Sequence, residues 1–110
     1  MTSGVRETPA RFDAPPSLEA VLEVLRAYQP KAREIGVELV GVVGSVARGD
    51  AGPNSDVDVV YDVTGRPTLF GLGGIVADLQ DRLGRQVDVI DRQMMKPERW
   101  LYMSRDLVTL

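Results

Sequence analysis

Cysteine and histidine are both absent from this chain of 110 residues, and aromatic residues make up only 5% of it. Without cysteine the chain can form neither disulfide bonds nor thiolate metal sites. Without histidine it also lacks the commonest metal ligand and the usual general base near neutral pH. Any chemistry that the chain performs must therefore rest on carboxylates, hydroxyls, amides and arginines.

Long apolar runs and strong net charge are missing as well. No window approaches the roughly 18 uninterrupted apolar residues of a membrane-spanning helix. The formal net charge is -3 and no run of lysine or arginine occurs, which argues against direct binding to a long nucleic acid. We therefore expect a soluble cytoplasmic protein with no membrane partner and no direct nucleic-acid partner.

The first part of the chain differs from the rest in its pattern. Residues 1–16 contain three prolines and show neither a helical nor a strand period, so we expect a flexible lead-in there. The remaining residues, 17–110, are long enough to bury one small core. The chain is therefore predicted to hold a single domain after the lead-in.

An amphipathic helix is predicted to open the domain. Ser17 is suited to cap it, since its hydroxyl can accept from a backbone amide of the first turn. Apolar residues follow at helical spacing: Leu18, Val21, Leu22, Leu25 and Tyr28. Pro30 is expected to interrupt this helix, leaving a short second helix over residues 31–35 that ends at Gly36.

Two strands are predicted next, joined by a loop. Residues 37–43 are rich in valine and run into Gly44, as a buried strand that enters a glycine turn would. Residues 45–55 contain turn-forming glycine, proline and asparagine, and are expected to form a loop. Residues 56–61 alternate in character, with one acidic face (Asp56, Asp58, Val60) and one apolar face (Val57, Val59, Tyr61). The acidic face is expected to bind a ligand, and the apolar face is expected to pack in the core.

The second half of the domain continues the alternation of helix and strand. A helix is predicted near residues 73–83, ending at Gly84, and a third strand over residues 86–90. A short helix over residues 97–103 precedes residues 107–110, which are expected to add an edge strand or to dock on the core. The order predicts an α/β fold: a small mixed sheet, helices packed on one face and an open acidic face.

Three carboxylates and a glycine-serine turn form the most informative pattern. Asp56 and Asp58 stand at positions i and i+2 of a strand, so both project from the same face. Asp88 lies within the third strand and can complete a site built from oxygen ligands, the type that Mg²⁺ prefers. The Gly44-Ser45 turn lets backbone amides approach a phosphate without an intervening Cβ. Together these residues predict a metal-dependent nucleotide-transfer site.

The same segments carry a family resemblance. Residues 44–49 (GSVARG), 55–60 (SDVDVV) and 84–90 (GRQVDVI) resemble the polymerase beta-like nucleotidyltransferase superfamily. The match is closer to its minimal nucleotidyltransferase (MNT) branch, and it extends from about Leu18 to the C-terminus. The resemblance implies the polymerase beta-like nucleotidyltransferase fold for residues 17–110.

The resemblance also implies a function. Small members of this branch are antitoxins that form a hetero-oligomer with a HEPN-type RNase toxin. They transfer AMP from ATP to a tyrosine of the toxin, which blocks its RNase activity. The family's site residues would be Asp56, Asp58 and Asp88 as ligands of two Mg²⁺ ions, with Gly44, Ser45 and Arg48 binding the nucleotide.

Simpler interpretations remain open for the same residues. Asp56 and Asp58 could be solvated residues at the start of an edge strand, and Asp88 could mark only an exposed strand face. Arg48 could form a surface salt bridge with Asp50 or Asp56 instead of binding phosphate. The alternative function is a non-catalytic antitoxin that neutralises its toxin by stoichiometric binding.

Overall fold

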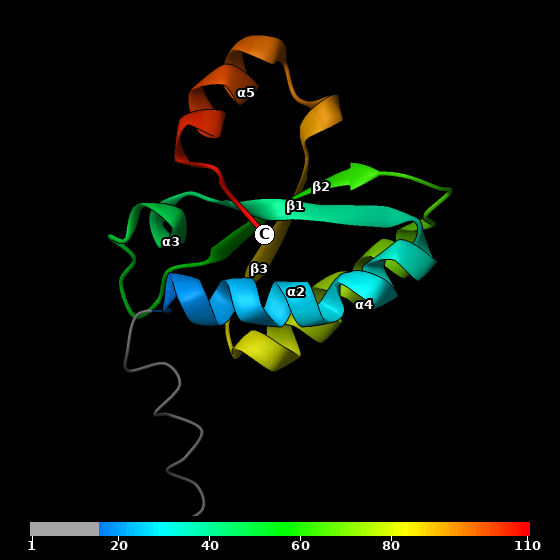
Figure 1. The fold of residues 1–110 in the computed structure, drawn as a ribbon, viewed down its shortest axis with the longest axis horizontal. Helices are drawn as coiled ribbons and strands as arrows, with labels where there is room; N and C mark the ends of the chain where they lie inside the picture. The colour runs from blue at the N-terminus through cyan, green and yellow to red at the C-terminus, as the bar shows by residue number, and fades with distance from the viewer. Residues whose placement is uncertain (1–15) are drawn as a thin grey trace, which may run out of the picture.

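The computed structural model describes residues 16–110 as a mixed α/β fold built on a four-stranded sheet (Figure 1). All but the last residue of the predicted lead-in, residues 1–16, lies outside the described residues. The elements, in order, are α2 (Leu18–Ile35), β1 (Val37–Val43), α3 (Ser45–Arg48), β2 (Val57–Val63), α4 (Leu69–Leu83), β3 (Val87–Asp91), the 3-10 turn η2 (Arg92–Met94), α5 (Pro97–Met103), the 3-10 turn η3 (Ser104–Asp106) and β4 (Val108–Thr109). Within residues 16–110 no helix is long and apolar enough to cross a membrane.

The sheet has the strand order β3-β2-β1-β4. Strand β1 runs antiparallel to β2 and to the short β4, whereas β2 and β3 are parallel. A parallel pair needs a crossover connection, and α4 supplies it. The last residues do add an edge strand, so the first of the two roles expected for residues 107–110 is confirmed.

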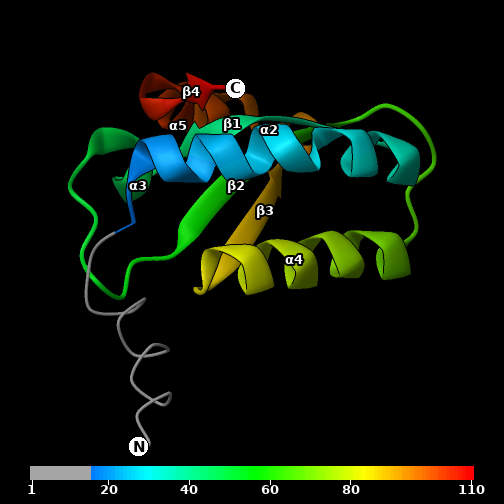
Figure 2. The same cartoon turned by 60° about the horizontal axis from the view of Figure 1, so that its bottom comes forward.

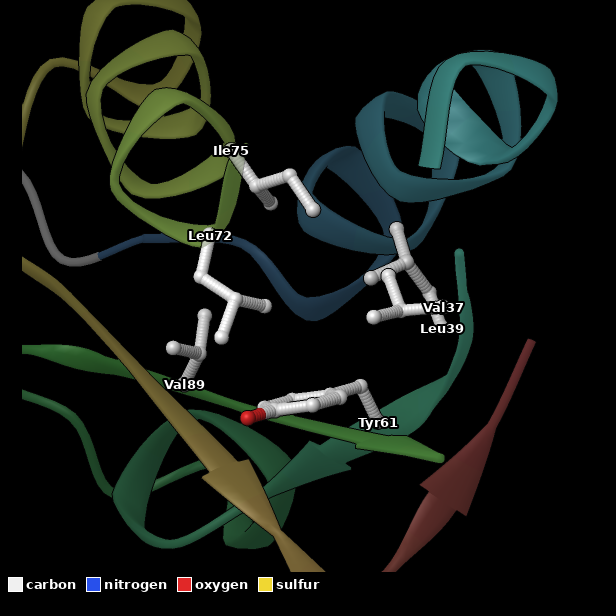
Figure 3. A pocket seen from close by; sticks show the side chains of 6 residues that line it. All are labelled: Val37, Leu39, Tyr61, Leu72, Ile75 and Val89. Atoms are coloured by element: carbon white, nitrogen blue, oxygen red, sulfur yellow. The ribbon is translucent and has the colours of Figure 1, made fainter. Parts of the chain in front are cut away.

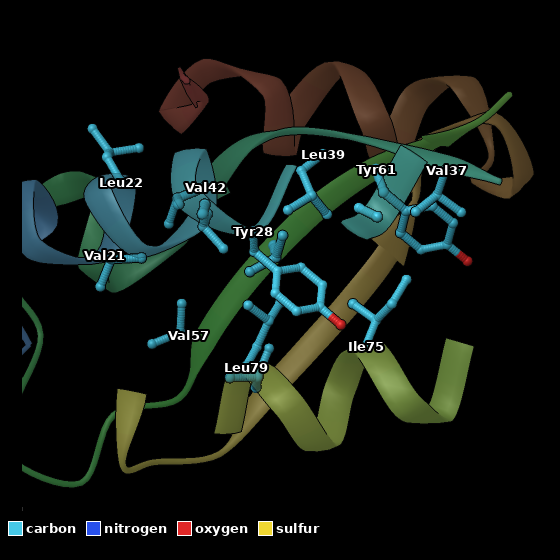
Figure 4. Close-up of a cluster of buried hydrophobic side chains, with 14 of the residues drawn as sticks. Val21, Leu22, Tyr28, Val37, Leu39, Val42, Val57, Tyr61, Ile75 and Leu79 are labelled. Atoms are coloured by element: carbon cyan, nitrogen blue, oxygen red, sulfur yellow. The ribbon is translucent and has the colours of Figure 1, made fainter. Parts of the chain in front are cut away.

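Helices α2 and α4 cover one face of the sheet and contact each other (Figures 1 and 2). The core between them and the sheet is apolar, and no polar or charged side chain of residues 16–110 is fully buried. Leu79 and Val57 have no exposed surface in this core (Figure 4), and the same holds for Leu25 and Val59. The predicted packing face of β2 is therefore confirmed, because Val57, Val59 and Tyr61 all belong to the core cluster.

A narrow apolar gap remains between α4 and the sheet. It is lined by Val37, Leu39, Tyr61, Leu72, Ile75 and Val89 (Figure 3). The gap has no room for a water-sized sphere. It is a packing defect of the core and offers no place for a ligand.

The predicted break at Pro30 is wrong, because α2 continues through this residue to Ile35. Tyr28 and Ala32, on either side of Pro30, are both buried in the core. Burial of one continuous apolar stripe compensates for the backbone hydrogen bond that proline cannot donate. The helix ends where expected, at Gly36, which adopts the left-handed conformation.

Helix α4 begins at Leu69, four residues before the predicted start near Gly73. Thr68 caps it, since its hydroxyl accepts from the amide of Gly71 at 2.9 Å. Gly71 lies in the first turn although glycine disfavours helices, and it has a packing role. A Cβ there would lie 2.9 Å from Ile35 Cγ2, so glycine lets α4 approach the end of α2.

The opposite face of the sheet carries the acidic residues and is partly covered. Figure 1 shows α5 on the other side of the sheet from α2 and α4. Val43 and Val60 are buried without belonging to the main core cluster. The turns η2 and η3, on either side of α5, contact β2 and β1 respectively. The C-terminal segment therefore shields the apolar part of this face and leaves its acidic end accessible.

Candidate active site

Strand pairing brings two of the predicted carboxylates together. In the parallel register of β2 and β3, Asp58 lies directly beside Asp88. Paired residues of neighbouring strands point to the same face, so both side chains lie on the face opposite α2 and α4. Asp56 comes just before β2, one residue outside the strand that was predicted to include it. Both Asp56 and Asp88 are exposed, whereas Asp58 is half-buried.

The Gly44-Ser45 turn lies against Asp58. Gly44 follows β1 with φ 81° and ψ -156°, a conformation that other residues rarely adopt. A Cβ on Gly44 would lie only 2.5 Å from Asp58 Oδ2. Glycine is therefore required both by the backbone conformation and by the close approach of the carboxylate. The predicted glycine turn and the predicted aspartate thus form one local structure.

The segment after this turn differs from its prediction. Residues 45–55 were expected to be a loop throughout, but the first four form the helical turn α3. Val46 explains the difference, since its side chain is 1% exposed and joins the core cluster. Burial of one apolar residue folds the chain back immediately after the strand. Ser45 thereby starts a helical turn directly after Gly44, whose backbone lies against Asp58.

The carboxylates affect each other electrostatically. Burial raises the pKa of Asp58, and the charges of Asp88 and Asp56 raise it further, while Arg48 lowers it. A carboxylate surrounded by like charges is costly to ionise. A cation placed among these groups would relieve the repulsion and lower the pKa of Asp58.

The donor chemistry suits a hard divalent cation, because Asp56, Asp58 and Asp88 offer only oxygen ligands. Within the described part of the chain, however, no three carboxylate side chains stand close enough together to hold a metal ion as they lie. Two of them, Asp56 and Asp88, are exposed and can change rotamer at little cost. Mg²⁺ binding by these residues therefore stays a prediction.

Arg48 is paired with carboxylates on two sides. Its Nε donates to Asp50 at 3.2 Å and its Nη1 donates to Asp106 at 3.0 Å. The pair with Asp50 is one of the simpler interpretations considered from the sequence. The contact with Asp106 was not predicted, because 58 residues separate the two and no local pattern indicates it. Phosphate binding by Arg48 would require an exchange of these partners, and it stays a prediction.

A pocket lies next to this arginine. It is lined by Arg48, Tyr102, Arg105 and Asp106. The Arg105 guanidinium lies over the Tyr102 ring, 5.4 Å from its centre. The pocket therefore combines an aromatic ring with two cationic side chains and one anionic side chain. Its lining comes both from the C-terminal segment and from α3, the helical turn that starts at Ser45.

Comparison with known proteins gives concordant matches. Residues 18–108 match the model of a family described as the nucleotidyltransferase domain. Protein adenylyltransferase MntA of Thermococcus cleftensis is 35% identical over 81 residues, which span 73% of this chain and 82% of that protein.

Two solved structures share the fold. One, classed as a minimal nucleotidyltransferase, superposes with a TM-score of 0.73 at 28% identity and covers 86% of this chain and 96% of that chain. The other is a crystal structure of a toxin-antitoxin with AMP-PNP, with a TM-score of 0.52 at 20% identity, covering 71% of this chain and 60% of that chain. At 20% identity the second match shows the shared fold alone.

Proposed function

This chain belongs to the nucleotidyltransferase domain family, and on that basis we propose that it is a protein adenylyltransferase acting as an antitoxin. Its reaction transfers AMP from ATP to a tyrosine hydroxyl of a HEPN-type RNase toxin and so neutralises the toxin. One observation carries the proposal: Gly44 packs against Asp58, and Asp58 lies beside Asp88. The relative named as a protein adenylyltransferase supports a protein as the acceptor.

The chemistry divides among these residues. The acceptor oxygen forms a bond to the α-phosphorus of ATP, the bond from that phosphorus to the β-phosphate oxygen breaks, and pyrophosphate leaves. Asp88 is exposed and would accept the proton of the hydroxyl group. Gly44 and Ser45 would bind the phosphates through backbone amides and the serine hydroxyl.

Asp56, Asp58 and Asp88 would hold Mg²⁺ in this reaction. The ions would neutralise phosphate charge and favour ionisation of the acceptor hydroxyl, whose ordinary pKa is about 10. The raised pKa of Asp58, caused by burial and by its acidic neighbours, supports this role. It is the behaviour expected of carboxylates grouped to bind cations rather than to stabilise the fold.

The accessibility of the site supports a macromolecular acceptor. Asp56 and Asp88 are exposed, so a hydroxyl carried on another protein can reach them. The toxin-antitoxin neighbour was crystallised with a nucleotide analogue, which agrees with a toxin as partner and ATP as substrate.

Intact mass spectrometry of the HEPN-type partner tests the proposal. The partner is incubated with this chain, ATP and MgCl₂, in parallel with the Asp56→Ala/Asp58→Ala double variant. Asp81→Ala is the matched control, because Asp81 is an exposed carboxylate on α4. We expect the partner to gain AMP with the wild type and with the control but not with the double variant.

The stoichiometric antitoxin is the competing function, and an RNase assay on the same mixtures, compared with the partner's mass, decides between the two. Exposed apolar side chains such as Phe70 and Leu101, at 92% and 70% exposure, could support tight binding without chemistry. Neutralisation of the toxin with unchanged partner mass, equal for the wild type and the double variant, would favour binding and contradict the enzymatic proposal.

A further inference from the structure

The three tyrosines of this chain differ sharply in accessibility. Tyr28 is 1% exposed and its hydroxyl donates to Asp78 at 2.6 Å. Tyr61 is 8% exposed, and burial raises its pKa. Tyr102, in contrast, is 71% exposed. Among the tyrosines only Tyr102 can present its hydroxyl to a substrate without unfolding part of the domain.

The position of Tyr102 places it beside the proposed nucleotide site. It lines one pocket with Arg48, although the two residues belong to different ends of the chain. Arg48 ends α3, the helical turn that starts at Ser45. The charge of Arg48 lowers the pKa of Asp58. The guanidinium that lines the pocket of Tyr102 is therefore also near the carboxylates.

Charges around Tyr102 suit a phosphate group attached to it. Arg105 lies over the ring of Tyr102, and Arg48 lines the same pocket. An AMP group on the tyrosine oxygen would add a phosphodiester with one negative charge. The two guanidiniums can pair with that charge as they do with other phosphates, and Arg48 would then exchange its exposed contact with Asp106.

We propose that Tyr102 is an acceptor in the chain's own reaction, so that the protein adenylylates itself at this residue. This inference rests on the proposed function. The phenolic oxygen of Tyr102 forms a bond to the α-phosphorus of ATP, and the bond to the β-phosphate oxygen breaks. Pyrophosphate leaves, and the phenolic proton passes to Asp88 or to solvent.

Labelled ATP tests the inference with the full chain and no partner. The protein is incubated with MgCl₂ and with ATP labelled at either the α- or the γ-phosphate, then digested with trypsin and mapped by mass spectrometry. Cleavage after Arg99 and Arg105 releases Tyr102 in the peptide 100–105, whereas the peptide 27–31 holds Tyr28. We expect label from the α-phosphate only, carried by the peptide 100–105.

Matched variants identify the atom that is modified. Tyr102→Phe retains the ring under Arg105 but removes the hydroxyl, and it should lose the label. Ser104→Ala removes the other hydroxyl of the same peptide, and Tyr61→Phe removes a buried one; both should retain the label. Asp58→Asn should abolish it, because the reaction is lost while Tyr102 is intact.

A parallel reaction with the HEPN-type partner separates this inference from the proposed function. AMP on the partner but none on the chain alone would overturn self-adenylylation and leave the proposed function standing. AMP on neither protein would overturn both. Label that persists in Tyr102→Phe would place the modification elsewhere and overturn the assignment to this residue.

Discussion

The two faces of the sheet are built from the same strands but serve opposite purposes. On one face Val57 and Val59 are fully buried against α2 and α4. On the other face Asp58, between these two valines in sequence, lies beside Asp88, and its pKa is raised by burial and by its acidic neighbours. The first face stabilises the fold, and the second places like charges together at a cost to stability. This difference is what we expect if the acidic face serves binding and chemistry, as proposed above.

Removal of core volume should have the largest effect on stability. Leu79 has no exposed surface, so Leu79→Ala should lower the free energy of unfolding by about 2–5 kcal/mol, as buried leucine truncations do. Urea unfolding measures this change. Leu101→Ala is the control, since Leu101 is 70% exposed, and its effect should stay within about 0.5 kcal/mol. Similar effects of the two substitutions would remove the contrast between packed and open regions.

Gly44→Ala should come next, because it affects the junction of the two faces. The positive φ and the 2.5 Å approach to Asp58 Oδ2 both disfavour a Cβ, with a cost of about 1–3 kcal/mol. Gly49→Ala is the matched control: its φ is +84°, but a Cβ there would meet no atom within 4 Å. We expect Gly44→Ala to destabilise more in urea unfolding and to abolish AMP transfer, whereas Gly49→Ala retains transfer. If Gly44→Ala and Gly49→Ala lost the same stability and the same transfer, the positive φ would explain both losses and the approach to Asp58 would not matter.

Asp58→Asn should have a smaller effect on stability, and of the opposite sign. The folded state holds the pKa of Asp58 above its ordinary value, so the unfolded chain loses this proton at lower pH. The free energy of unfolding therefore falls as pH rises from the ordinary pKa of an aspartate to the raised pKa of Asp58, and it stays lower above that range. At neutral pH Asp58→Asn should raise the free energy of unfolding by about 0.5–2 kcal/mol while it abolishes AMP transfer. The gain should vanish at a pH below the ordinary pKa of an aspartate.

Urea unfolding at neutral and acidic pH measures that gain, with Asp81→Asn as the exposed carboxylate control. Asp81→Asn should change neither stability nor transfer. A loss of stability in Asp58→Asn at neutral pH would mean that Asp58 supports the fold, contrary to the distinction between the two faces.

The ion pair between Arg48 and Asp106 should contribute least. Both side chains are partly exposed, at 46% and 29%, so Asp106→Asn should cost less than about 1 kcal/mol. The difference from the wild type should shrink further in high salt, because mobile ions screen exposed pairs. Thermal unfolding at low and high ionic strength measures it. A large effect that does not depend on salt would show that the C-terminal segment is held by this pair rather than by its apolar contacts.

Local signals predicted much of the fold. The valine-rich run gave the bounds of β1, Val37–Val43, and glycine gave the ends of two helices. Gly36 and Gly84 both adopt the left-handed conformation expected of such caps. Local signals failed where tertiary packing opposes them. Pro30 stays within α2 because Tyr28 and Ala32, two residues away on either side, are buried. Gly71 lies within α4 because it packs against Ile35.

The candidate site was likewise predictable where local spacing specifies it and not where tertiary structure does. Spacing alone indicated that Asp56, Asp58 and the Gly44-Ser45 turn belong together. The pairing of Asp58 with Asp88 depends on a parallel register between strands 30 residues apart, which no local pattern specifies. The contact of Arg48 with Asp106 likewise depends on how the C-terminal segment returns to the sheet. Asp88 could be proposed as a third oxygen ligand because it lies in a predicted strand, but the sequence did not specify that it lies beside Asp58.

The most direct test of the account is the rate of AMP transfer to the proposed HEPN-type partner by the Asp88→Asn variant. Asp88 joins the site only through the register of β2 and β3, and it is exposed, so the fold should tolerate the substitution. We predict that transfer is abolished while urea unfolding shows a folded domain. A wild-type rate in this variant would contradict the claim that the acidic face of the sheet is the catalytic site.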